Sequence, residues 1–186
     1  MGLIRGLWNG VLSAWIRFGV TVFPRTIHPM VLHFPIVLLY LTLLIEIARL
    51  LGGARQEAFF QRAGFWTLSL SLLAIVAAAA AGVISEQFVK WTPQTAALLA
   101  AHQRDAALTG VFALAAWVIR MLTRFPSNAR MRPSSQWSAF GGRGRATILS
   151  TVMVLAAVIM ISITGSLGGA MVYHYGAGTP STQKTP

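Results

Sequence analysis

Four long apolar stretches divide the chain, at about residues 30–51, 64–84, 101–119 and 147–172. A helix needs about 20 mainly apolar residues to cross a hydrocarbon layer of about 30 Å, and each stretch reaches or approaches that length. The third stretch is the least apolar, and its polar residues gather at its start. The pattern predicts an all-α membrane protein, a bundle of four transmembrane helices over residues 26–178, with a disordered tail at 179–186.

Residues 1–25 form a separate segment with a different pattern. Its polar residues recur every four positions, at Arg5, Asn9, Ser13 and Arg17, and apolar residues fill the other faces. This spacing predicts an amphipathic helix that lies flat in the membrane interface. A fifth transmembrane helix is the alternative, with Arg17 extending its side chain toward the surface.

Local signals place the helix boundaries. His28 precedes Pro29, which predicts extended chain at His28 and a helix that begins near the proline. Pro35 cannot donate a backbone hydrogen bond, so a bend is expected near His33. Thr92 and Pro93 are a suitable cap and first turn for the third helix.

The charge distribution predicts the orientation of the bundle. The chain has a net charge of +11 and is 55% hydrophobic, with only 10% charged residues. Arginines gather at one set of helix ends, where cytoplasmic connections of membrane proteins carry their positive charge. They are Arg49, Arg55, Arg62, Arg120, Arg124, Arg130, Arg132, Arg143 and Arg145. This placement argues against nucleic-acid binding and predicts that the opposite ends and the C-terminus are periplasmic.

All four histidines of the chain fall at the predicted outer ends of the helices. His28 and His33 open the first span, His102 opens the third, and His174 closes the fourth. Ionisable groups in or beside a bilayer are costly and indicate function by default. Glu86, Asp105 and Tyr173 lie at the same ends.

Histidines on two helices of a bundle can hold a haem iron between them. Because the chain has no cysteine, thiolate metal sites and cysteine-bound iron–sulfur clusters are excluded. Five residues separate His28 from His33, so in one helix their side chains point about 140° apart. We expect His33 to point into the bundle with His102, and His28 to lie nearer the water. The last span contains glycines that would let a flat macrocycle approach, or that serve helix packing alone: Gly165, Gly168 and Gly169.

Simpler roles stay open for several of these residues. His28 and His174 also suit interfacial anchors, and Glu86 and Asp105 also suit ion pairs with Lys90 or Arg104. Glu46 is expected to pair with Arg49 or Arg62. The methionines, among them Met30 and Met171, are expected to pack, although a His/Met haem pair stays open. No hydrolytic or phosphate-binding motif is present.

The segment HPMVLHFPIVLL, residues 28–39, resembles the opening motif HPxxxHFPI of a bacterial membrane family, the domain of unknown function 2231 family. The closing segment GGAMVYHYGAG resembles that family's GGxxVYxxGxG motif, and the resemblance covers about residues 26–178. Family members also have an acidic residue near the end of the second span and a histidine at the start of the third. The matching residues here are His28, His33, Phe34, Pro35, Glu86, His102, Gly168, Gly169, Val172, Tyr173, Gly176 and Gly178.

One departure from the family pattern concerns the closing motif. Many members have a histidine immediately before its glycine, whereas this chain has Tyr175 there and His174 one place earlier. The family has no established activity. Some relatives are joined to Rieske-type or cytochrome c domains, which implies redox work at the outer face of the bacterial cytoplasmic membrane.

The leading hypothesis is a haem-b-binding electron-transfer protein of that membrane. His33 and His102 are the expected axial ligands, with His28, His174, Glu86 and Tyr173 around them. The expected partners are the lipid bilayer and a periplasmic electron carrier, quinone or a larger membrane complex. Two alternatives stay open: a cofactor-free accessory subunit of such a complex, and a metal site of histidines with Glu86.

Overall fold

The computed structural model describes residues 2–51, 57–124 and 145–179, all of which lie in helices or short connections. The elements in chain order are α1 (Gly2–Val22), α2 (Ile27–Val31), α3 (His33–Leu51), α4 (Glu57–Ser85), the 3₁₀ turn η1 (Glu86–Phe88), α5 (Pro93–Arg124) and α6 (Arg145–Tyr173). The predicted disordered tail, apart from residue 179, lies outside the described residues, and so do residues 125–144 of the polar, Gly/Pro/Ser-rich cytoplasmic loop that the sequence predicts at 124–146.

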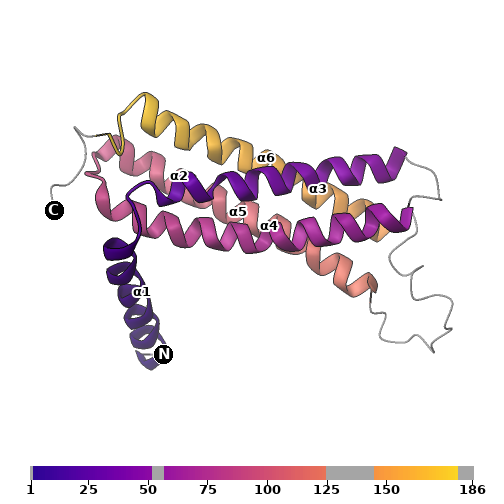
Figure 1. Cartoon of the computed structure of the whole chain (residues 1–186), viewed down its shortest axis with the longest axis horizontal. Coiled ribbons are helices and arrows are strands. Elements are labelled where there is room, and N and C mark those ends of the chain that lie inside the picture. The colour runs from indigo at the N-terminus through magenta and orange to yellow at the C-terminus, as the bar shows by residue number, and fades with distance from the viewer. Residues whose placement is uncertain (1, 52–56, 125–144, 180–186) are drawn as a thin grey trace.

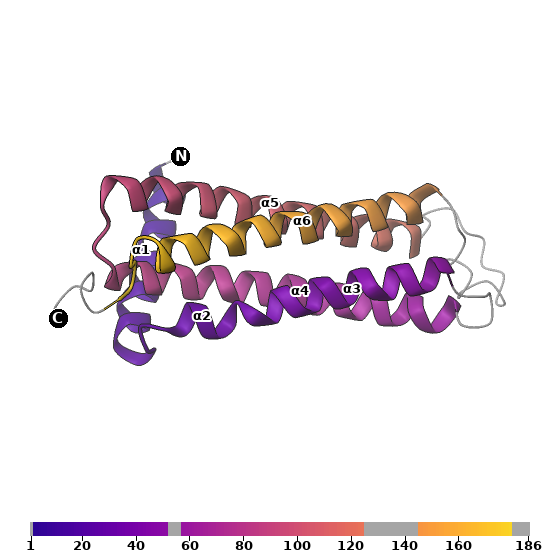
Figure 2. The ribbon, with the colours of Figure 1, turned by 90° about the horizontal axis from the view of Figure 1, so that it is seen from above.

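Four helical segments are long and apolar enough to cross a membrane: Ile27–Leu51, Ala58–Phe88, Pro93–Leu122 and Thr147–Tyr173. They lie side by side as one elongated bundle (Figures 1 and 2). Large apolar side chains such as Leu44, Leu73 and Val76 are exposed on its outside, while polar Thr42 and Ser71 are buried inside. This distribution suits a bundle surrounded by lipid, so the predicted all-α membrane fold is confirmed.

The centre of the bundle is packed mainly with small and medium-sized side chains. Its fully or nearly fully buried members are Leu39, Leu68, Ala113, Ala116, Val154, Ala157 and Val158. Five of the seven come from α6 and the alanines of α5, so α5 and α6 approach each other closely. The predicted cap at the start of α5 is present, because Thr95 N donates to Thr92 Oγ1 at 3.3 Å.

The helix is interrupted where the bend near His33 was expected, since α2 ends at Val31 and α3 begins at His33. Pro35 has no N–H, and the next backbone bond, from Ile36 N to Leu32 O, is long at 3.5 Å. The expectation of extended chain at His28 is wrong, because His28 is helical in α2. Its N–H donates to Ser85 Oγ at 3.2 Å, and this tertiary bond outweighs the local preference of a residue before proline.

Helix α1 lies across the end of the bundle rather than along it (Figure 1). It packs on α4, where Trp15 Nε1 donates to Ala80 O at 3.3 Å. Gly19 lies directly against the side chain of Ile84, which would have to move to admit a Cβ there. Helix α1 is not among the four candidate spans. Its direction and composition both favour the interfacial placement over a fifth transmembrane helix.

Candidate functional site

The two ends of the bundle differ in chemistry. The histidine end is the one where α2 and α5 begin and α4 and α6 finish, and it contains His28, Glu86, His102 and His174. The arginine end is the opposite one and contains Arg49, Arg62 and Arg120. The predicted gathering of the histidines at one end therefore agrees with the order and direction of the helices.

His28 and His102 form a pair at the histidine end. Their ring centroids lie 6.1 Å apart, and their planes meet at 78°. His28 comes from α2 and His102 from the third turn of α5, so the pair bridges the first and third spans. Both side chains are half-buried.

Each ring of the pair is held by a neighbouring helix in the same way. His28 Nδ1 donates to Ala78 O on α4, and His102 Nδ1 donates to Thr164 O on α6, each at 2.9 Å. A carbonyl oxygen only accepts, so Nδ1 of each ring carries the proton.

A glycine follows each accepting carbonyl by four residues, on the face that the ring covers. A Cβ at Gly82 would lie 3.3 Å from His28 Nδ1, and a Cβ at Gly168 would lie 3.4 Å from His102 Cε1. The two helical hairpins, one formed by α2, α3 and α4 and the other by α5 and α6, thus share one arrangement. In each, a histidine hydrogen-bonds to a backbone carbonyl of the next helix and packs on a glycine of that helix. Gly168 makes room for the His102 imidazole, whereas a Cβ at Gly165 would meet nothing within 4 Å.

The two hydrogen bonds leave the second ring nitrogens available. With the proton on Nδ1, a neutral imidazole has its lone pair on Nε2, the usual state of a histidine that ligates a metal. Nε2 of neither ring has a hydrogen-bond partner among the described residues. The arrangement therefore presents two oriented imidazole ligands from two separate hairpins.

The structure does not bring His33 to His102, as the sequence had suggested it would, and places His28 beside His102 instead. His33 is the first residue of α3 and its side chain is exposed, so His28 occupies the inner position. The two side chains point in different directions, as expected, but it is His28 that points into the bundle and His33 that is exposed. The reason is that the α2 turn presents His28 to Ala78 and Ser85 of α4, which fixes the inward face.

His174 and Tyr173 lie at the end of α6 on its exposed side, and Tyr173 is 88% exposed. Neither is brought to the histidine pair. The chain turns directly after them through Gly176 and Gly178, whose positive φ angles of 66° and 78° require glycine. The closing glycines thus have a backbone role.

Glu86 lies in η1, and its Oε1 accepts a hydrogen bond from Gln103 Nε2 at 2.8 Å. Gln103 follows His102 directly, so this bond ties the α4–α5 connection to the helix that carries one ligand. The expected ion pair of Glu86 with Lys90 is absent from the described part of the chain. The expected pair of Asp105 with Arg104 is present at 2.8 Å.

No three or more histidine, aspartate or glutamate side chains of the described residues gather as a metal-binding group. The hypothesis of a metal site built from several histidines with Glu86 therefore gains no support in that part of the chain. The ligand set that the geometry offers there is the pair His28 and His102.

A second polar cluster lies inside the bundle toward the arginine end. Glu46 is fully buried and forms ion pairs with Arg49, at 3.0 Å, and with Arg120 of α5. Thr151 Oγ1 of α6 donates to its Oε2 at 3.1 Å. The pairing with Arg49 matches the expectation from the sequence. The contacts with Arg120 and Thr151, which join α3 to α5 and α6, are visible only in the fold.

Substitution of Gly168 tests whether the His102 ring packs directly on this glycine. Gly168→Val is expected to lower the free energy of unfolding by about 1–3 kcal/mol, because its side chain meets the His102 ring. Gly165→Val carries the same helix penalty but has open space, so it serves as the control. Thermal unfolding of both variants in detergent measures the difference. Equal losses of stability would contradict the packing of the His102 ring on Gly168.

Comparison with known proteins places the chain in a family. No curated protein and no solved structure matches it. The family model described as "Predicted membrane protein (DUF2231)" matches residues 24–181, which include all four spans and both histidines of the pair. The chain belongs to this family of membrane proteins, the domain of unknown function 2231 family.

Proposed function

We propose that this protein is a redox subunit of the bacterial cytoplasmic membrane that holds haem b between His28 and His102. The observation that carries the proposal is the paired seating of the two rings, with Nδ1 of each on a carbonyl and Nε2 of each available. Imidazoles oriented by such backbone bonds are the usual ligands of protein-bound metals. Haem iron held by two histidines is a one-electron carrier.

The separation of the rings also suits a metal ion held by both imidazoles. An ion bound in line between two imidazole nitrogens, at about 2.0–2.1 Å from each, leaves the ring centres roughly 6 Å apart. The centroids of His28 and His102 are 6.1 Å apart. The donor set is also suitable, because two neutral imidazoles and no thiolate are typical of haem b electron carriers.

The position of the pair points to the partners. Both histidines lie at the end opposite the arginines, which the positive-inside bias assigns to the periplasmic side. With the centre near one surface, the expected exchange of electrons is with a periplasmic carrier or quinone at that surface, or within a larger complex. Transfer across the whole membrane would need a second centre near the arginine end.

A cofactor-free accessory subunit is the second candidate, and one observation favours it. Each histidine already makes a hydrogen bond and packs on a glycine, so the two histidines also hold α2 against α4 and α5 against α6. In that case the pair would stabilise the bundle without holding iron, and the exposed outer faces would contact partner subunits.

An optical spectrum of the full chain, purified in mild detergent from haem-replete membranes, separates the candidates. A Soret band and an α band that sharpens on reduction with dithionite support the haem proposal. A flat spectrum from folded protein without bound metal would replace it with the accessory subunit. A metal found by elemental analysis without haem would assign the two histidines to a simple metal ion.

The orientation has its own test, made simple because the chain contains no cysteine. Lys90→Cys, in the connection before α5, is expected to react with a membrane-impermeant maleimide added to intact cells. Ser135→Cys, between α5 and α6, is expected to react only after the inner membrane is opened. The reverse labelling pattern would place the histidine pair in the cytoplasm.

A further inference from the structure

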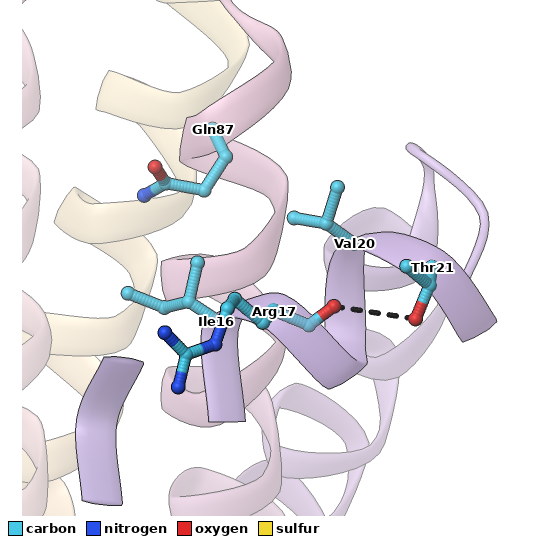
Figure 3. A pocket seen from close by; sticks show the side chains of 5 residues that line it. All are labelled: Ile16, Arg17, Val20, Thr21 and Gln87. Atoms are coloured by element: carbon cyan, nitrogen blue, oxygen red, sulfur yellow. Dashed lines mark hydrogen bonds between the residues drawn. The ribbon is translucent and has the colours of Figure 1, made fainter. Parts of the chain in front are cut away.

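Helix α1 and the turn η1, which directly follows α4, border a groove at the histidine end. The groove has a volume of about 510 Å³ and is lined by Ile16, Arg17, Val20, Thr21 and Gln87. Figure 3 shows Ile16 and Arg17 of α1 lying below Gln87, the middle residue of η1. The groove therefore lies where the bundle meets the helix that crosses its end.

The groove is placed at the depth of lipid headgroups. The spans set the membrane normal, and α1 lies across them at their ends, so its axis runs along the membrane surface (Figures 1 and 2). Exposed apolar side chains of α1, among them Leu7, Val11 and Phe18, suit contact with acyl chains. A groove beside such a helix opens to lipid rather than to bulk water.

The chemistry of the groove is aliphatic with one cation. Ile16 and Val20 supply apolar walls, and Arg17 is exposed at the rim. The Arg17 guanidinium has no ion pair or hydrogen bond among the described residues, although its backbone carbonyl accepts from Thr21 Oγ1. A second arginine, Arg25, lies at the same end over the ring of Phe88, with 5.6 Å from Cζ to the centroid.

We infer that this groove binds an anionic phospholipid. Its acyl chain lies along Ile16 and Val20, and its phosphate accepts hydrogen bonds from Arg17. An arginine at a membrane surface prefers an anionic headgroup to a zwitterionic one, because the net negative charge is not balanced within the lipid. The bound lipid would fix α1 against the bundle beside the histidine pair.

Native mass spectrometry of the full chain in detergent tests this inference. The probe is an equimolar mixture of phosphatidylglycerol and phosphatidylcholine of distinguishable mass. The wild-type chain is expected to retain phosphatidylglycerol preferentially, and Arg17→Gln is expected to lower the ratio of the two bound lipids about fivefold. Lys90→Gln removes the same charge at the same end but outside the groove, and is expected to leave the ratio unchanged.

A further variant separates the groove from the charge. Val20→Trp fills the apolar part and is expected to lower the retention of both lipids, while circular dichroism shows the helices intact. The inference is wrong if the wild-type chain shows no preference for phosphatidylglycerol. It is equally wrong if Arg17→Gln keeps the wild-type ratio, or if Lys90→Gln lowers the ratio as much as Arg17→Gln does.

Discussion

Replacing Glu46 with alanine is expected to cost about 3–5 kcal/mol of folding free energy, the largest loss of stability among the substitutions considered. The carboxylate is fully buried between Arg49, Arg120 and Thr151. Its removal leaves two largely buried guanidinium groups without this counter-charge, in a bundle whose outside faces hydrocarbon. Three of the spans would lose a shared contact at once.

The measurement is denaturant unfolding of detergent-solubilised protein, followed by circular dichroism. Glu86→Ala is the control, since Glu86 is only half-buried and accepts from one amide, so its loss is expected to stay near 1 kcal/mol. Glu46→Gln keeps the shape of the side chain but removes its charge, and should fall between the two. A Glu46→Ala variant as stable as Glu86→Ala would show that the buried cluster does not hold the arginine end together.

Replacing His28 with asparagine is expected to lower the haem content of the purified protein at least tenfold. The amide nitrogen of asparagine can take the place of Nδ1 and keep the bond to Ala78 O, but asparagine offers nothing in the place of Nε2. The variant thus removes the candidate ligand atom and keeps the hydrogen bond to Ala78 O. His102→Asn is expected to behave in the same way toward Thr164 O.

His33→Asn is the matched control, five residues along the same span and exposed. It is expected to keep the wild-type haem content, as determined from the pyridine haemochrome spectrum. A loss of haem in His33→Asn with retention in His28→Asn would restore the pairing that the sequence alone suggests. The accessory-subunit interpretation would be favoured if the wild-type chain and all three variants contained no haem and were equally stable.

The sequence predicts the bundle well because lipid imposes a simple rule on it. Each span must be apolar for its full length, so its boundaries are visible in the order of residues alone. The interruption of the helix before His33 and the pairing of Asp105 with Arg104 depend on near neighbours in the chain and were predictable for that reason.

The choice between His28 and His33 was not accessible to the same reasoning. Helical spacing gives the angle between two side chains, but not which of them faces inward. That choice is made by Ala78, Gly82 and Ser85, which lie more than forty residues away on another helix. The sequence also contains no sign that the two hairpins share the same histidine–carbonyl–glycine contact, because that contact does not depend on a repeated string of residues.

The central claim is that two imidazoles, those of His28 and His102, share one iron, and electron paramagnetic resonance tests it most directly. The oxidised full chain, frozen in detergent, is expected to give a low-spin ferric signal typical of two nitrogen ligands. His28→Asn is expected to convert any remaining iron to a high-spin signal, while His33→Asn keeps the low-spin one. A low-spin signal that survives in His28→Asn would contradict the account. So would folded wild-type protein, purified from haem-replete membranes, that contains no haem iron.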